Sequence, residues 1–232
     1  MKSIGKVAIV MTSVIILMYG GAGLLKLLGI DGGPITKIVP FVAMLIGTTV
    51  FLKFIDKKKI SEIGLHKMSS AWSYTIILAI LALLPLFVGL ILNNGIQLTK
   101  PIDSTLFITV AYCFLIGFAE ELFYRGYIYH TVSGNRLKIV ISALAFAGFH
   151  FISPEFNILL FVLYFLYGVM KAYLFRMILN LWPLIIFHMI WDLAATYTDF
   201  YSNPIIALLS LAVTVIVIGV VVKCRDKKTA IL

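Results

Sequence analysis

Six ionisable residues stand inside segments of the sequence that are otherwise strongly apolar. They occur in three groups, at Glu120, Glu121 and Arg125, at His150, and at His188 and Asp192. A charged side chain in the middle of a membrane-spanning helix costs roughly 2.5–3.5 kcal/mol, so such residues generally face a partner or an interior cavity. We therefore expect these six residues to meet inside the protein and to serve its function.

The spacing of the first group separates its two glutamates. Glu121 and Arg125 are four residues apart, which places them on one helical face in the acid-before-base order that favours pairing. Glu120 is rotated by about 100° from Glu121 in an α-helix, so it needs a different partner. We interpret Glu121 and Arg125 as a structural ion pair and Glu120 as available for chemistry.

The remaining carboxyl groups and histidines are suited to hydrolysis. A carboxyl group withdrawn from water among apolar helices can act as a general base near neutral pH, and donors fixed in a dry cavity stabilise an oxyanion. The same four residues, Glu120, His150, His188 and Asp192, could also hold zinc with an open water position. The sequence has no His-Glu-x-x-His motif, so a site without metal or other cofactor stands beside the zinc site as a hypothesis. The alternative is that these side chains only join helices by hydrogen bonds.

The composition decides which elements must position these residues. The chain of 232 residues is 62% hydrophobic and 12% charged, whereas soluble domains are about 45–50% apolar and about 25% charged. We therefore predict an all-α, polytopic membrane helical bundle that forms a single membrane domain over 1–232. Eight segments are apolar enough to cross a bilayer, at about 7–28, 35–55, 71–92, 105–129, 138–152, 157–175, 179–198 and 204–223. The fifth segment is short.

The distribution of Lys and Arg predicts the orientation of this bundle. Eight spans with a cytoplasmic N-terminus place fifteen basic residues, including Lys171 and Arg176, on the cytoplasmic side and three on the opposite side. This asymmetry follows the positive-inside rule and predicts that both termini face the cytoplasm, at a plasma membrane. The net charge of +9 does not indicate nucleic-acid binding, because the basic residues stand between apolar runs and not on one exposed face.

The same topology brings the polar groups to a similar depth. The helical rise puts Glu120 and His188 ~14 Å, His150 ~18 Å and Asp192 ~20 Å from the cytoplasmic boundary. Agreement in depth among three segments favours a common site over separate contacts between helices.

Three motifs on successive apolar segments resemble those of a known family. They are Glu-Glu-x-x-x-Arg at Glu120, Glu121 and Arg125, Phe-x-x-x-His at Phe146 and His150, and His-x-x-x-Asp at His188 and Asp192. Together they resemble the CPBP (Abi) family of CAAX-processing and bacteriocin-processing intramembrane proteases. The segment Ser-Glu-Ile-Gly-Leu at 61–65 is similar to a weaker signature of that family. The motifs make 105–198 the expected catalytic core.

The resemblance implies a role for each matching residue. In the type II CAAX endopeptidases, Glu120 and His150 would correspond to the pair that activates a water, and His188 and Asp192 to the pair at the oxyanion. A charged carboxylate cannot donate a hydrogen bond, so Asp192 would have to be protonated there or would orient His188. The implied activity is that of a glutamic-type intramembrane endopeptidase acting on a peptide or lipidated protein, such as a prenylated or leader-peptide substrate, in membrane lipid.

Two other functions remain as alternatives. Members of the same family include bacteriocin-immunity and regulatory membrane proteins, so the chain could be a non-catalytic binding protein. A transporter could use Glu120 and the histidines as a proton relay, but the sequence shows no inverted repeat of the kind that marks many transporters. The complete set of motif residues favours the endopeptidase.

Overall fold

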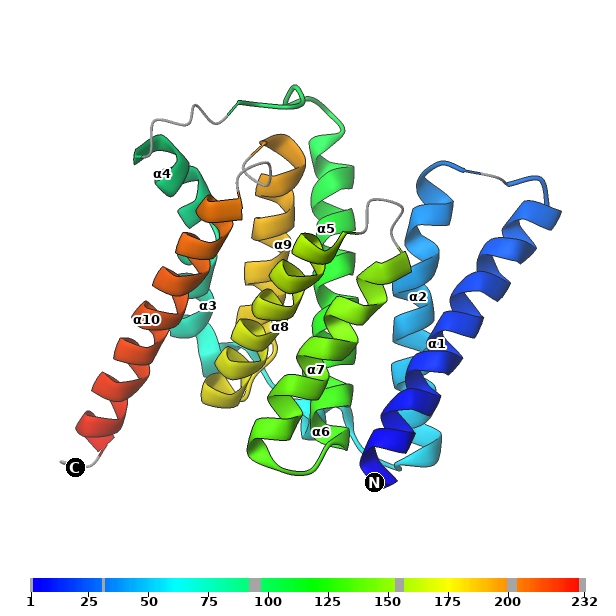
Figure 1. The fold of residues 1–232 in the computed structure, drawn as a ribbon, viewed down its shortest axis with the longest axis horizontal. Coiled ribbons are helices and arrows are strands. Elements are labelled where there is room, and N and C mark those ends of the chain that lie inside the picture. Colours follow the sequence, from blue (N-terminus) through cyan, green and yellow to red (C-terminus); the bar gives the residue numbers. More distant parts are fainter. Residues whose placement is uncertain (1, 31, 92–96, 153–156, 200–203, 230–232) are drawn as a thin grey trace.

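The computed structural model describes residues 2–30, 32–91, 97–152, 157–199 and 204–229, and nearly all of these are helical (Figure 1). The first half of the chain holds α1 (Lys2–Leu27), α2 (Pro34–Val50), η1 (Phe51–Ile55), η2 (Ile60–Ile63), η3 (Met68–Ala71), α3 (Trp72–Leu81) and α4 (Leu84–Ile91). The second half holds α5 (Leu106–Glu120), η4 (Glu121–Ile128), α6 (Tyr129–Thr131), α7 (Asn135–Phe149), η5 (His150–Ile152), α8 (Ile158–Ile178), α9 (Trp182–Tyr197) and α10 (Pro204–Thr229). The predicted all-α bundle is confirmed.

Helix length divides the eight predicted segments into two groups. Within the described residues, six helical stretches are long and apolar enough to cross a membrane, at Ser3–Leu27, Ile35–Ile55, Ile60–Gly89, Leu106–Thr131, Ile158–Ile178 and Pro204–Cys224. The other two predicted segments correspond to α7 and α9, which have 15 and 16 residues where a span needs about 20. The predicted end of the third segment, at 92, lies outside the described residues. The two short helices are those that lead to His150 and carry His188.

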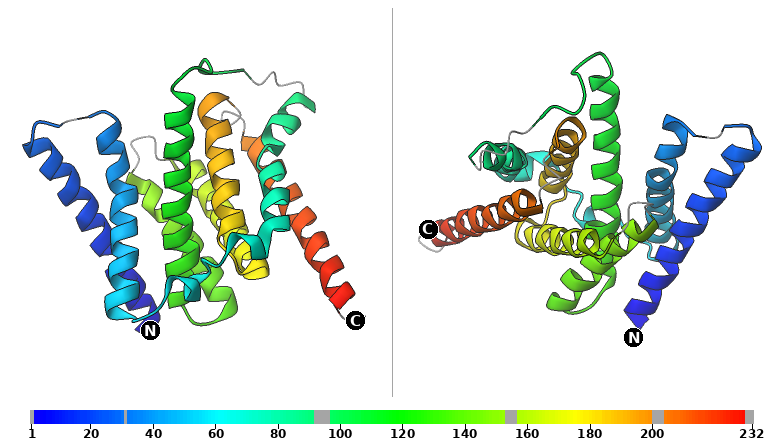
Figure 2. Two further views of the ribbon diagram at one scale, coloured as in Figure 1. Left: turned by 180° about the vertical axis from the view of Figure 1, so that it is seen from behind. Right: turned by 45° about the horizontal axis from the view of Figure 1, so that its top comes forward.

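The helices pack as neighbouring pairs around the middle of the bundle. The closest pairs are α7 with α8, α5 with α9, α1 with α2, and α3 with α9. Figures 1 and 2 show α5 and α9 side by side in the centre, with α1 and α10 at opposite flanks. The first residues of α1 and the last residues of α10 lie at the same end of the bundle (Figure 1). This arrangement puts the motif-bearing helices at the centre.

The helix that carries the paired glutamates changes its winding between them. Glu120 is the last residue of α5, and Glu121 is the first residue of η4, a π-helical stretch that continues without a break. All eight residues of η4 are buried. π-helical turns are rare and frequently occur at functional sites, and here the wider turn begins at the second glutamate.

The Ser61–Leu65 segment packs against η4 and the turn between α8 and α9. Ile63 is buried and contacts Gly126, while the backbone oxygen of Gly64 accepts a hydrogen bond from the Leu181 amide at 2.9 Å. Gly64 has a φ of +97°, and a Cβ added there would lie 2.5 Å from Cζ of Phe175. Only glycine fits this position without strain. The segment therefore fixes the point where α9 begins.

A polar contact joins α1 to the end of the second helix and to η4. Tyr127 donates a 2.8 Å hydrogen bond to Oδ2 of Asp56, and Lys6 forms an ion pair with Oδ1 of the same carboxylate. Burial alone would raise the pKa of Asp56. The opposing effect is larger and comes from the hydrogen bonds of Lys6 and Tyr127 and from the charges of Lys6 and Lys58, so the pKa lies below the ordinary 3.8. Asp56 thus holds the N-terminal helix against the centre of the bundle.

Candidate active site

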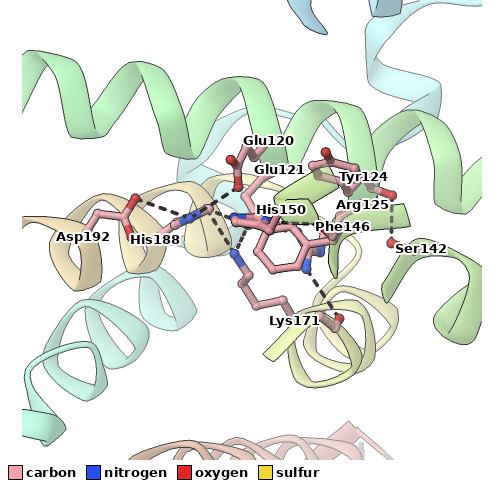
Figure 3. A network of polar contacts seen from close by, with 11 residues as sticks. Glu120, Glu121, Tyr124, Arg125, Ser142, Phe146, His150, Lys171, His188 and Asp192 are labelled. Carbon is pink, nitrogen blue, oxygen red and sulfur yellow. Dashed lines mark hydrogen bonds and ion pairs between the residues drawn. The ribbon is translucent and has the colours of Figure 1, made fainter. Parts of the chain in front are cut away.

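The four residues expected to carry chemistry line one cavity of about 650 Å³. Glu120 reaches it from the end of α5, His150 from the start of η5, and His188 and Asp192 from α9 (Figure 3). Aromatic and aliphatic side chains complete the wall, among them Phe41, Tyr112, Ile116, Leu160 and Tyr164. The cavity is therefore a mostly apolar pocket with its ionisable groups gathered on one part of the lining.

A glycine allows the two central helices to approach at this point. A Cβ added to Gly117 would lie 3.0 Å from the backbone oxygen of Ile185 and 3.2 Å from Cβ of His188. Because Gly117 is nearly one turn before Glu120, the absence of a side chain lets α5 bring Glu120 against α9. The close approach of these helices is what sets the distance between Glu120 and His188.

His188 lies at the centre of three carboxyl groups. Its Nε2 is 3.7 Å from Oε2 of Glu120 and 3.5 Å from Oδ2 of Asp192, and its Nδ1 is 2.8 Å from Oε1 of Glu121. The sequence placed His188 and Asp192 on one helical face, and the structure shows that contact. The sequence did not predict the contact of Glu121 with His188, because the two residues lie on different helices and no local pattern pairs them.

Glu121 is surrounded by cations as well as by the histidine. Its Oε1 lies 2.6 Å from Nζ of Lys171 and 3.4 Å from Nη1 of Arg125, and all three side chains are completely buried. The structure thus brings Glu121 and Arg125 together, as their spacing predicted, but the nearer cation is Lys171. Arg125 also approaches the backbone oxygen of Gly168 on α8, at 3.5 Å.

The position of Lys171 corrects the sequence analysis. The positive-inside count placed Lys171 on the cytoplasmic side, whereas its exposed fraction is 0% and its ammonium lies inside the bundle. It stands seven residues before the end of α8 at Ile178, about 10 Å along the helix axis. The sequence does contain a signal for this position, because a lysine within an apolar segment needs a buried partner, as Glu120 and Glu121 do.

The ring of Phe146 lies against the two buried cations of the site, Arg125 and Lys171. The guanidinium carbon of Arg125 lies 4.4 Å and Nζ of Lys171 4.7 Å from the centre of its ring. Lys171 also lies 4.3 Å from the ring centre of Tyr167. A cation over an aromatic face gains about 2 kcal/mol when both are withdrawn from water. The phenylalanine of the second motif thus helps to keep both cations in the interior.

His150 is oriented by its own helix and by α8. Its Nδ1 lies 2.8 Å from the backbone oxygen of Phe146, so the N–H of that nitrogen donates to the carbonyl and Nε2 is left as the acceptor. The ring stacks on Tyr164, with 4.0 Å between ring centres. These contacts hold His150 in the wall of the cavity, with its basic nitrogen available.

The arrangement of donors does not form a ready metal site. Among the described residues, no group of three or more His, Cys, Asp or Glu side chains is placed to hold a metal ion. Zinc needs its ligands about 2.0–2.2 Å from one point. Glu120, His150, His188 and Asp192 would be the ligands only after rearrangement.

The central part of the chain matches a known family. A family model described as type II CAAX prenyl endopeptidase Rce1-like matches residues 102–194. No curated protein is significantly similar to the chain. The matched range begins just before α5 and ends within α9, so it includes all six ionisable residues of the predicted site. The expected resemblance to the CPBP proteases is confirmed over residues 102–194, which match the Rce1-like family of type II CAAX prenyl endopeptidases.

Proposed function

We propose that this protein is an intramembrane endopeptidase that hydrolyses a peptide bond of a membrane-associated peptide or lipidated protein, without a metal or other cofactor. The observation that carries the proposal is the convergence of Glu120, His150, His188 and Asp192, from three helical segments, on one largely apolar cavity. Within the same range, the family match supports protease chemistry.

Glu120 is the group best suited to activate water. Unlike Glu121, it has no cation as close as 2.6 Å, and its Oε2 faces the cavity beside His188. Glu120 takes a proton from a water molecule, with the acceptor nitrogen of His150 helping to orient that water. The water oxygen then bonds to the carbonyl carbon of the substrate, and the carbonyl oxygen becomes an oxyanion.

His188 and Asp192 are placed to stabilise that oxyanion. A protonated Nε2 of His188 can donate a hydrogen bond into the cavity, and this is strongest where water is excluded. Asp192 either donates as a neutral acid or orients His188, which its 3.5 Å distance from Nε2 allows. When the intermediate collapses, Glu120 returns its proton to the leaving amine, so that one water is consumed and a carboxylic acid and an amine are released.

The same proposal includes a location and a substrate class. The chain would lie in a plasma membrane with both termini in the cytoplasm, because the positive-inside rule puts most of the basic residues on the side of the termini. The apolar part of the cavity wall suits a peptide with a lipid anchor or an apolar flank, such as a prenylated or leader-peptide segment.

The decisive experiment replaces Glu120 by Gln, which keeps the shape of the side chain and removes the base. The purified variant is compared with the wild type on a synthetic farnesylated peptide that ends in a CAAX box, and on the same peptide without the lipid. We expect Glu120→Gln to lower kcat by about 10²–10⁴-fold. Glu62→Gln, at an exposed position of η2, is the matched control and should cleave like the wild type.

A non-catalytic role as a bacteriocin-immunity or regulatory binding protein is the alternative. The same Glu120→Gln variant separates the two functions in cells. If the variant is folded and still supports the cellular phenotype, that phenotype depends on binding and not on hydrolysis.

A further inference from the structure

Lys171 is a buried cation that the expected catalytic groups do not include. It lies on α8, its exposed fraction is 0%, and its Nζ is 2.6 Å from Oε1 of Glu121 and 3.1 Å from Nδ1 of His188. Burying an ammonium group costs several kcal/mol unless its partners are well placed. We therefore expect the charge of Lys171 to be needed at this position.

The partners of Glu121 all converge on one of its oxygens. Lys171, His188 and Arg125 approach Oε1 at 2.6, 2.8 and 3.4 Å, whereas Oε2 has no hydrogen-bond partner within the described parts of the chain. Lys171 forms the shortest of these contacts. The orientation of this carboxylate therefore depends mainly on Lys171, since Arg125 is farther away and is also close to Gly168.

His188 is held on both sides by carboxyl oxygens. Glu121 faces Nδ1, while Glu120 and Asp192 face Nε2. Nδ1 lies 2.8 Å from Oε1 of Glu121 and 3.1 Å from Nζ of Lys171, and the nearer carboxylate oxygen favours an N–H at Nδ1 that donates to Glu121.

We propose that Lys171 is a positioning residue, which holds Oε1 of Glu121 against Nδ1 of His188 and thereby keeps Nε2 of His188 directed at the oxyanion side of the cavity. This inference rests on the proposed function, because it names how one helix prepares another for that reaction. Figure 3 shows the chain of contacts from Lys171 through Glu121 to His188. Lys171 itself is not required to touch the substrate.

Three variants test this inference by a double-mutant cycle. Lys171→Met removes the ammonium at similar length, Glu121→Gln removes its partner's charge, and the double variant removes both, which restores a neutral pair. Partners that orient a metal-bound histidine are worth about 10–100-fold, and we expect each single variant to lose kcat by a similar factor with KM nearly unchanged. The kcat of the double variant should be no lower than that of the less active single variant, because all three variants break the same chain of contacts.

A buried polar residue outside the cavity provides the control. Ser142 donates a 2.9 Å hydrogen bond to the backbone oxygen of Tyr124, so Ser142→Ala removes a buried polar group without touching the contacts of His188. It should keep the wild-type kcat. Additive losses in the double variant, or a wild-type kcat in Lys171→Met, would overturn the role of Lys171.

A spectroscopic measurement separates this inference from the proposed function. The chain has four histidines, so ¹⁵N-histidine spectra can be assigned by replacing His66, His130 and His150 in turn. We expect the Nδ1 of His188 to give a single protonated signal in the wild type and in Ser142→Ala, and a broadened or shifted one in Lys171→Met. An unchanged His188 signal in Lys171→Met would refute the inference even if no peptide is cleaved. Conversely, if Glu120→Gln is inactive and Lys171→Met is fully active, the proposed function is supported and only the role of Lys171 is refuted.

Discussion

Oε1 of Glu121 lies 2.8 Å from Nδ1 of His188, although the two residues are 67 positions apart in the sequence. This contact connects the Glu-Glu-x-x-x-Arg motif to the His-x-x-x-Asp motif through a residue, Glu121, that does not line the cavity. Glu120, one residue earlier, approaches the other nitrogen of the same ring at 3.7 Å. Adjacent glutamates therefore act on opposite sides of one imidazole, and they should respond differently to substitution.

Replacing Glu121 by Ala is expected to destabilise the fold. It leaves Lys171 and Arg125 buried without their carboxylate, and removing one partner of a buried ion pair costs about 3–5 kcal/mol. Glu120→Ala should cost less, because Glu120 borders the cavity. Yield and thermal unfolding in detergent measure the difference, and equal yields and unfolding temperatures of the two variants would contradict it.

Chelation is expected to leave cleavage unchanged. The reason is that the described side chains hold no preformed metal cluster and that Glu121 is occupied by Lys171 and Arg125. The purified protein is incubated with 1,10-phenanthroline, dialysed and assayed on the farnesylated peptide. Complete loss of cleavage that zinc alone restores would show a metal-dependent enzyme.

The contact of Asp56 with Lys6 and Tyr127 should make stability depend on pH. The pKa of Asp56 is lowered in the folded protein, so its contribution is complete above its unfolded pKa of about 3.9 and is lost as the pH falls through the lower folded value. Thermal unfolding of the wild type and of Asp56→Asn is compared between pH 7 and pH 3. The difference between them should be largest at pH 7 and shrink towards pH 3. A constant difference would show that the carboxylate charge is not involved.

Gly64→Ala is expected to weaken the attachment of the Ser61–Leu65 segment. An alanine there has to adopt a left-handed backbone conformation, which costs roughly 1–2 kcal/mol, and its Cβ would displace Phe175, where overpacking adds about 1–3 kcal/mol. Gly5→Ala is the control, because nothing lies within 4 Å of an added Cβ in α1. It should be neutral or slightly stabilising. A similar unfolding temperature for both variants would argue against this prediction.

The sequence predicted the helical bundle because apolar length is a local property. The segments and their order followed from runs of apolar residues, and the spacing of His188 and Asp192 followed from the period of an α-helix. The spacing of Glu121 and Arg125 likewise predicted their contact, whereas Glu120 and Glu121 share His188 as a partner. These predictions used only neighbours within a helix.

Contacts between helices were beyond such local rules. Lys171 was assigned to the membrane boundary because its segment ends a few residues later, and nothing in the local pattern pairs it with Glu121 on another helix. The π-helical turn at η4 depends on packing against α7, α8 and the Ser61–Leu65 segment, so it has no periodic signal in the sequence.

The shortness of α7 has a consequence for the surrounding lipid. Its 15 residues extend about 22 Å, whereas the hydrocarbon layer is about 30 Å thick, and Leu137, Val140 and Leu144 are exposed along its side. Such hydrophobic mismatch is relieved by thinning of the adjacent bilayer. His150 follows α7 directly, so a thinner bilayer there brings bulk water nearer to it. The acyl-chain length of the host membrane should therefore affect how readily water reaches the site.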